Sequence, residues 1–169
     1  MDNNRHTRQL VLAGIFAAVA VVGSMLGFPV AGSKCAPVQH MVNILSAVIL
    51  GPGWSVGIAF VASIIRNLLG IGSLMAFPGS MIGALCCGLT YKFTKKLELT
   101  CIAEALGTGI LGGLCAYPVA TLFMGIGGIA VTAYIVPFLI STVAGSILAY
   151  ILIKMLEKSG ILGSLMSQY

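Results

Sequence analysis

Apolar residues fill the chain in six long runs, and short segments rich in glycine, proline or charge separate them. A helix needs about 20 consecutive apolar residues to cross the hydrocarbon core of a bilayer. Four runs have about that length, whereas the second and third are shorter. The pattern therefore predicts six transmembrane helices, over Leu10–Phe28, Val38–Leu50, Trp54–Leu69, Leu74–Tyr91, Cys101–Met124 and Ile129–Met155.

The composition is that of an integral membrane protein. Of the 169 residues, 59% are hydrophobic and 8% are charged, whereas soluble domains carry about 25% charged residues. A water-soluble fold would lack the polar side chains to cover its surface. We therefore expect an all-α integral membrane protein, with residues 1–169 as a single domain and a multi-pass bundle in the cell membrane. The net charge of +5 forms no basic stripe, so it does not indicate nucleic-acid binding.

The positions of the basic residues set the expected topology. Lys and Arg are enriched in cytoplasmic loops. With a cytoplasmic N-terminus and six crossings, seven of the nine basic residues fall on the cytoplasmic side: Arg5, Arg8, Lys92, Lys95, Lys96, Lys154 and Lys158. The two exceptions are Lys34, in the first outer loop, and Arg66, near the outer end of the third helix. Both termini are therefore expected in the cytoplasm.

No catalytic or nucleotide-binding motif is present. The chain lacks G-x-x-x-x-G-K-[ST] and H-E-x-x-H, and its only aspartate, Asp2, lies in the N-terminal tail. We expect neither an enzyme nor a cofactor or metal site. Glu98 and Glu157 fall at cytoplasmic interfaces. Glu104 is the one acidic residue inside a predicted helix, and its position in the first turn of the fifth helix predicts a solvated or helix-capping carboxylate.

Polar and aromatic side chains gather in the outer half of the predicted bundle. Intramembrane polar residues are candidates for function, and several of them together predict a pocket open to the outside. Taken one at a time, these residues also have structural explanations. Arg66 could snorkel to the headgroups, Tyr117 and Tyr134 could belong to an interfacial aromatic belt, and His40 and Asn43 could bond to a neighbouring helix. The outer set is Gln39, His40, Asn43, Arg66, Asn67, Ser73, Phe77, Ser80, Tyr117, Thr121 and Tyr134.

The first predicted helix carries one face of small residues. Ala13, Ala17, Ala20, Ser24 and Gly27 follow one another at steps of four, three, four and three. Small faces let helices approach closely in lipid, where packing drives helix association. Two interpretations stay open: packing inside the bundle, and docking to a different membrane protein.

Several segments resemble the substrate-binding S components of energy-coupling factor (ECF) vitamin transporters. LAGIFAAVA resembles their small-residue first-helix motif, and LGPGW resembles the turn between their second and third helices. Three longer segments resemble the ThiW branch, which is assigned to the thiamine precursor hydroxyethylthiazole. These are QHMVNILSAVILGPGW, RNLLGIGSLMAFPGSMIGAL and EALGTGILGGLCAYPVA.

The resemblance implies partners and a transport cycle. An S component captures its ligand outside, docks on a transmembrane coupling protein that two ATPases drive, and releases the ligand inside. It implies that Ala13 and Ala17 form the docking face, and that the loop containing GSKCAP closes over the site.

The resemblance also implies roles for the outer polar residues. We expect Phe77, Tyr117 or Tyr134 to stack on the thiazole ring, and His40, Asn43 and Asn67 to bond to the hydroxyl and the ring nitrogen of the ligand. Ser80 is also expected in the substrate site. Arg66 would organise the wall. The apparent lack of an acidic residue in the outer half favours a neutral thiazole over cationic thiamine. The alternatives are an S component for another vitamin, one for an anionic precursor held by Arg66 and Lys34, and a stand-alone secondary transporter.

Overall fold

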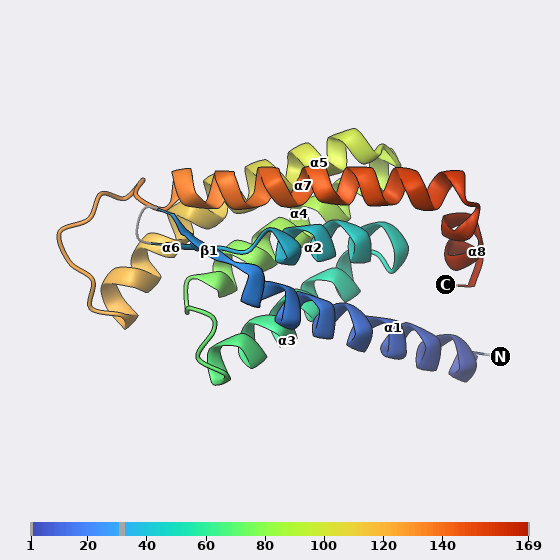
Figure 1. Cartoon of the computed structure of the whole chain (residues 1–169), viewed down its shortest axis with the longest axis horizontal. Coiled ribbons are helices and arrows are strands. Elements are labelled where there is room, and N and C mark those ends of the chain that lie inside the picture. Colours follow the sequence, from blue (N-terminus) through green and yellow to red (C-terminus); the bar gives the residue numbers. More distant parts are fainter. Residues whose placement is uncertain (1, 31–32, 169) are drawn as a thin grey trace.

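The computed structural model describes residues 2–30 and 33–168, and nearly all of its ordered elements are helices (Figure 1). Gly32 of the GSKCAP segment lies outside the described residues. The elements are α1 (Asp2–Gly23), η1 (Ser24–Leu26), β1 (Phe28–Val30), β2 (Ser33–Cys35), α2 (Pro37–Ile49), α3 (Pro52–Leu68), α4 (Ala76–Thr94), α5 (Leu97–Leu106), η2 (Gly107–Gly112), α6 (Gly113–Pro118), η3 (Val119–Phe123), α7 (Ile135–Lys158) and α8 (Ile161–Gln168).

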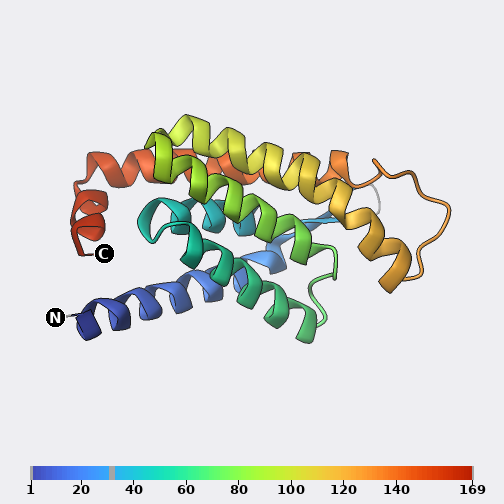
Figure 2. The ribbon, with the colours of Figure 1, turned by 180° about the vertical axis from the view of Figure 1, so that it is seen from behind.

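The helices run alternately along the long axis of the molecule. Because α5, η2, α6 and η3 follow one another without a break, the described residues contain six main helical segments and the terminal helix α8. Both termini lie at the same end (Figures 1 and 2). The β1–β2 hairpin and the loop between α3 and α4 lie at the opposite end. The alternation agrees with the six predicted segments.

The six segments differ in whether they are long enough to cross a bilayer. Among the described residues, three helical stretches are sufficiently long and apolar: Asn4–Leu26, Leu97–Phe123 and Ile135–Lys158. Helix α2 has only 13 residues. The all-α membrane class is thus supported, while six complete crossings remain a prediction.

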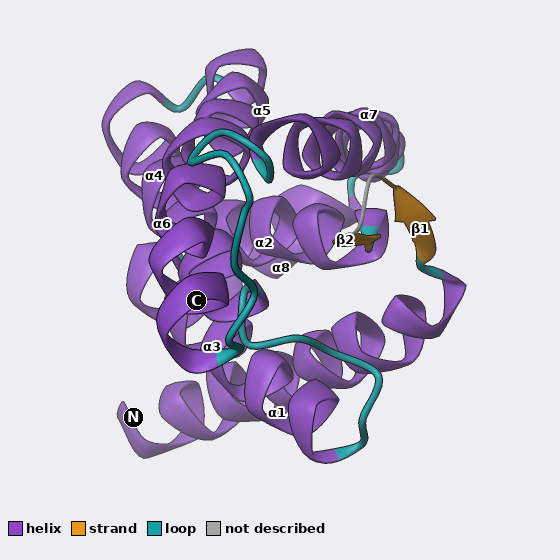
Figure 3. Cartoon of the chain, turned by 90° about the vertical axis from the view of Figure 1, so that its left-hand side faces the viewer, coloured by secondary structure: helices purple, strands orange, loops and turns teal. Residues whose placement is uncertain are grey.

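Helix α2 is short because protein rather than lipid surrounds it. Ten of its 13 residues are buried, and it packs against α1, α3, α4, α5 and α7. Figure 3 shows it in the middle of the bundle. A helix in this position does not need the length of a lipid-facing span, and its polar side chains meet neighbours from several helices.

Close helix contacts depend on glycine at a few positions. A Cβ atom at Gly112 would lie 2.7 Å from the Cα of Gly79, so the backbones of η2 and α4 approach each other closely. The π-helical turns of η2 (Gly107–Gly112) begin where these two elements pack. Single wide turns of this kind are frequent at functional sites.

The small-residue face of α1 packs inside the bundle. Ala13 and Ala17 are 6% and 7% exposed and belong to a core cluster with Val42, Ile58 and Ala62. In the isolated chain, Ala13 and Ala17 therefore pack inside the bundle. The small residues next to them, Gly14 and Ala18, are exposed.

Candidate functional site

Glu104 is buried inside the protein, so the expectation of a solvated or capping carboxylate is wrong. Helix α5 begins at Leu97, four residues before the predicted start at Cys101, which places Glu104 about two turns into the helix. The residue is 0% exposed. A buried carboxylate within an apolar helix is a candidate functional group.

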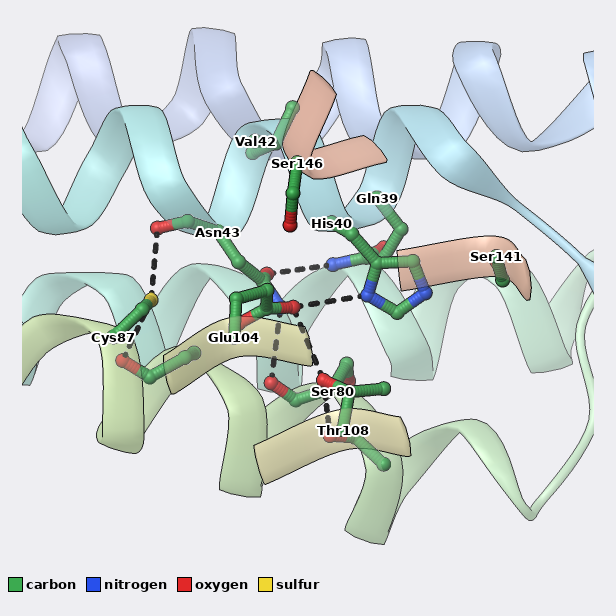
Figure 4. A network of polar contacts seen from close by, with 12 residues as sticks. Gln39, His40, Val42, Asn43, Ser80, Cys87, Glu104, Thr108, Ser141 and Ser146 are labelled. Carbon is green, nitrogen blue, oxygen red and sulfur yellow. Dashed lines mark hydrogen bonds and ion pairs between the residues drawn. The ribbon is translucent and has the colours of Figure 1, made fainter. Parts of the chain in front are cut away.

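One oxygen of Glu104 lies within hydrogen-bond distance of three donors (Figure 4). Oε1 is 3.0 Å from His40 Nδ1, 3.1 Å from Asn43 Nδ2 and 3.0 Å from Thr108 Oγ1. An ionised carboxylate accepts hydrogen bonds only, so it satisfies all three donors at one atom. The other oxygen, Oε2, is buried and has no partner in the described part of the chain.

A chain of hydrogen bonds runs from Glu104 to Arg66 on α3. Arg66 Nη1 donates to Gln39 Oε1 at 3.2 Å, and Gln39 Nε2 donates to Asn43 Oδ1 at 3.2 Å. Asn43 Nδ2 then donates to Glu104 Oε1 and to the carbonyl oxygen of Ser80. Every step has the same donor direction, so the cation and the carboxylate occupy opposite ends of one polar chain. We use the term polar network for the residues Arg66, Gln39, Asn43, Glu104, His40 and Thr108.

His40 is held by Glu104 on one side and presents its second nitrogen on the other. Nδ1 lies 3.0 Å from Glu104 Oε1, and whether it donates or accepts in this contact depends on the tautomer of the ring. Figure 4 shows the other nitrogen, Nε2, on the side of the ring that faces Ser141. With the proton of neutral His40 on Nδ1, Nε2 accepts a hydrogen bond, and it donates one in the protonated form. The ring therefore suits the recognition of a polar ligand atom.

A cavity lies beside the polar network, at the end of the molecule opposite the termini. The empty space between its walls, including the part that is open to the surroundings, is about 490 Å³. The hairpin, α2, α3, α4, η2 and α7 all contribute to its walls. The residues that line it include Lys34, Gln39, His40, Arg66, Ser73, Ala76, Gly79, Ser80, Thr108, Phe138 and Ser141.

The predicted polar residues divide between the wall and its support. His40, Arg66 and Ser80 line the cavity. Asn43 lies behind them, bonded to Ser80 and Glu104. Asn67 Nδ2 donates to the carbonyl oxygens of Ser63 and Ser73, which fixes the loop between α3 and α4. Arg66 is 4% exposed and faces the cavity, so it does not snorkel to the headgroups.

The predicted aromatic residues do not line the cavity. Phe77 packs edge-on against Phe60, with ring centroids 6.0 Å apart, and Tyr134 is buried in a separate core cluster. Tyr117 is also absent from the walls. The geometry therefore gives no support to stacking by these three residues. Phe138, one helical turn after Tyr134, is the aromatic side chain on the wall.

Sequence reasoning missed Glu104, Thr108, Phe138 and Ser141 as parts of the site. One signal was available: Glu104 and Thr108 are four residues apart, so they share a helix face, and Thr108 Oγ1 contacts both Glu104 Oε1 and the carbonyl oxygen of Gly79. The side of α7 on which Ser141 lies is known only from the structure, where its hydroxyl accepts a hydrogen bond from the Ala36 amide.

The polar network offers no cluster for a metal ion. Within residues 2–30 and 33–168, no three His, Cys, Asp or Glu side chains are grouped closely enough to hold one. Glu104 and His40 form the only ion pair of the described residues that involves histidine.

Comparison with known proteins identifies the family. Neither the curated proteins nor the solved structures yield a match. The family model for "Thiamine-precursor transporter protein (ThiW)" matches residues 10–159, which include every helix of the cavity wall. With nearly the whole bundle covered by that match, the chain belongs to the ThiW family of thiamine-precursor transporters.

Proposed function

We propose that this ThiW-family protein is the membrane substrate-binding subunit, or S component, of an ECF-type transporter. The observation that carries the proposal is the cavity beside the His40–Glu104 pair, in a chain whose family transports a thiamine precursor. The chain has no P-loop motif, so in this proposal partner subunits bind the ATP that drives uptake. The partners are a coupling protein and two ATPases.

The proposed substrate is hydroxyethylthiazole. His40 Nε2 and the hydroxyl groups of Ser80 and Ser141 provide hydrogen-bonding groups for the ring nitrogen and the hydroxyl of the ligand. Asn43 and Asn67 affect the ligand indirectly, by holding the cavity wall in place. Their side-chain amides donate hydrogen bonds to protein carbonyl oxygens, those of Ser80 and Ser63 respectively. Phe138 takes the stacking role that we expected of Phe77, Tyr117 or Tyr134.

The buried Glu104 changes the argument about ligand charge. The expected lack of a carboxylate in the outer half was the reason to favour a neutral thiazole over cationic thiamine. Glu104 lies beside the site, yet it does not line the cavity, and Oε1 already faces three donors. Because the partners of Oε1 are protein groups, Glu104 is not free to pair with a cationic ligand. We therefore still favour a ligand that is not cationic.

Docking of the subunit is proposed to use α1. Ala13 and Ala17 are buried in the isolated chain, so a direct contact between them and a coupling protein requires α1 to move. Gly14 and Ala18 are exposed one position further on, and a Cβ at Gly14 would meet nothing within 4 Å. This outer side of α1 supports close approach by another helix.

The His40–Glu104 pair favours one other candidate, a self-contained transporter coupled to protons. Titratable groups at membrane depth often serve as proton relays. Against this candidate, Glu104 is the only carboxylate among the buried residues of the described chain. A relay that reaches both surfaces would need further groups.

Two experiments test the proposal. Purified chain alone should bind hydroxyethylthiazole more tightly than thiamine or hydroxymethylpyrimidine by calorimetry; tighter binding of thiamine would overturn the assigned substrate. Liposomes that contain the chain alone should show no uptake under a pH gradient, whereas co-reconstitution with the coupling protein, the ATPases and ATP should restore uptake. Gradient-driven uptake by the chain alone would instead support the proton-coupled candidate.

A further inference from the structure

Arg66 is a buried cation without an anionic partner. It is 4% exposed, and the hydrogen bond from Nη1 to the neutral amide of Gln39 is its one side-chain hydrogen bond within the described chain. Its Nε is buried and has no partner. A buried charge is expensive unless it is paired. A guanidinium with unused donors on the wall of a cavity therefore indicates that something absent from the protein supplies the negative charge.

Glu104 does not supply it. The only ion pairs among the described residues are His40–Glu104 and Lys154–Glu157. Gln39 and Asn43 separate Arg66 from Glu104, and the single bonded oxygen of Glu104 faces His40, Asn43 and Thr108. The carboxylate of Glu104 is therefore occupied by His40, Asn43 and Thr108 and does not pair with Arg66.

A second cation approaches the same cavity from the hairpin. Lys34 on β2 lines the wall, and its Nζ donates to the carbonyl oxygen of Ile71, in the loop between α3 and α4, at 3.1 Å. That neutral acceptor leaves two further N–H donors on the ammonium. No aspartate or glutamate lines the cavity. Lys34 and Arg66 therefore make this part of the wall positive.

Helix α4 adds to the positive potential. It begins at Ala76, and Ala76, Gly79 and Ser80 of its first turns line the cavity. The N-terminus of a helix carries the positive end of its dipole and favours anions. The dipole acts in the same direction as the two side-chain cations and at the same wall.

We infer that the cavity contains an anion subsite formed by Arg66 and Lys34, so that a thiazole bearing a carboxylate or a phosphate group binds more tightly than neutral hydroxyethylthiazole, which refines the proposed substrate within the same thiazole class. The inference rests on the proposed function, because the thiazole ring comes from there. The guanidinium binds the anionic group through charge-assisted hydrogen bonds, and Lys34 exchanges the Ile71 carbonyl for the same group. His40, which lines the cavity from α2, remains available for the ring.

The test compares ligands that differ only in charge. Calorimetry on the purified full-length chain measures Kd for hydroxyethylthiazole, its phosphate ester and a thiazole carboxylate. We expect at least one anionic compound to bind about tenfold or more tightly than the neutral alcohol, and the stronger of the two identifies the group. The advantage should shrink as the salt concentration rises. Affinity for the neutral alcohol equal to or above that for both anions would overturn the inference.

Three variants assign the effect to the two cations. Arg66→Gln and Lys34→Gln should remove most of the anion advantage, measured in each variant as the ratio of the Kd for the neutral alcohol to the Kd for the anion, and Arg66→Lys should retain part of it. Lys34 is exposed, so Lys34→Gln remains informative if Arg66→Gln fails to fold. An unchanged anion advantage in Lys34→Gln and in a folded Arg66 variant would refute the assignment.

A ring-free readout separates this inference from the proposed function. Thermal stabilisation of the full chain is measured with inorganic phosphate and with acetate. If no thiazole compound binds, the proposed function fails; stabilisation by either anion that is lost in Lys34→Gln would still support the subsite. Absence of both thiazole binding and anion stabilisation would overturn the two together.

Discussion

His40 on α2 and Glu104 on α5 are 64 residues apart in the sequence, and 3.0 Å separates His40 Nδ1 from Glu104 Oε1. The pair joins the central helix to an outer one, and its two residues are both buried. Removing one partner of such a pair leaves a polar group without compensation in a low-dielectric interior. The pair is therefore expected to affect stability through Glu104 and ligand binding through His40.

The first prediction concerns Glu104 and stability. Glu104→Ala removes the shared partner of His40, Asn43 and Thr108. Thr108 keeps the carbonyl oxygen of Gly79 as an acceptor, and each of the other buried polar groups left unpaired costs about 1–3 kcal/mol. We expect a marked fall in the midpoint of thermal unfolding in detergent, with a smaller fall for Glu104→Gln, which keeps an acceptor oxygen. Glu98→Gln, at an exposed position of the same helix, is the control and should change little. Equal midpoints for Glu104→Ala and Glu98→Gln would contradict the central role of Glu104.

The second prediction concerns His40 and ligand binding. His40→Ala should lower the affinity of the purified chain for its thiazole ligand about tenfold, as expected for one lost hydrogen bond and lost ring contact. The chain provides a matched control, because its only other histidine, His6, is exposed on α1. His6→Ala should bind as the wild type does. Similar affinities in the two variants would remove His40 from the site.

The sequence predicts the helical segments well because runs of apolar residues leave few alternatives in a membrane protein. It also places His40, Arg66 and Ser80 at one end of the bundle, and all three line the cavity. Their shared depth follows from the alternating direction of the helices, which the loops between the runs reveal.

The sequence does not show which of several side chains at the same depth point into the cavity. Tyr134 and Phe138 are four residues apart and their ring centroids lie 6.3 Å apart, yet only Phe138 lines the cavity, because Tyr134 is buried in a core cluster with Met75, Ala116 and Ala120. Glu104 was misplaced for a different reason: its role depends on where α5 begins. The KFTKKLELT segment is polar enough to read as a loop, but its last residues form the first turn of that helix.

The third prediction concerns Gly145, where α7 passes close to α2. A Cβ there would lie 2.6 Å from the Cβ of His40 and in contact with the carbonyl oxygen of Pro37. Gly145→Ala should therefore push α2 and α7 apart, with a loss of about 1–3 kcal/mol of stability and weaker ligand binding. Gly57→Ala, on α3 with nothing within 4 Å of the added atom, should be neutral or more stable by about 0.5–1 kcal/mol. A folded Gly145→Ala with full affinity would show that His40 does not need its present position.

The fourth prediction concerns topology. Epitope tags at the two termini should be reached by antibody only after the membrane is permeabilised, because both ends lie together (Figures 1 and 2) and the basic residues favour the cytoplasm there. A tag inserted after Gly127, in the loop before α7 at the opposite end, should be reached in intact cells. Termini accessible from opposite sides would exclude an even number of crossings.

The fifth prediction separates the two faces of α1. Ala17→Leu adds three carbons to a core position that packs near Val42 and Ile58, so it should destabilise the isolated chain by about 1–3 kcal/mol and weaken ligand binding. Ala18→Leu adds the same atoms at an exposed position and should leave stability and binding of the isolated chain unchanged.

Transport assays then decide what the exposed face does. If a coupling protein approaches α1 through Gly14 and Ala18, Ala18→Leu should reduce ATP-dependent uptake severalfold although ligand binding is intact, because one bulky side chain keeps two helix backbones apart. If docking instead uses Ala13 and Ala17 after a movement of α1, Ala18→Leu should transport normally, and only variants that also destabilise the chain should lose uptake. The pair of variants thus distinguishes a docking surface from core packing on the same helix.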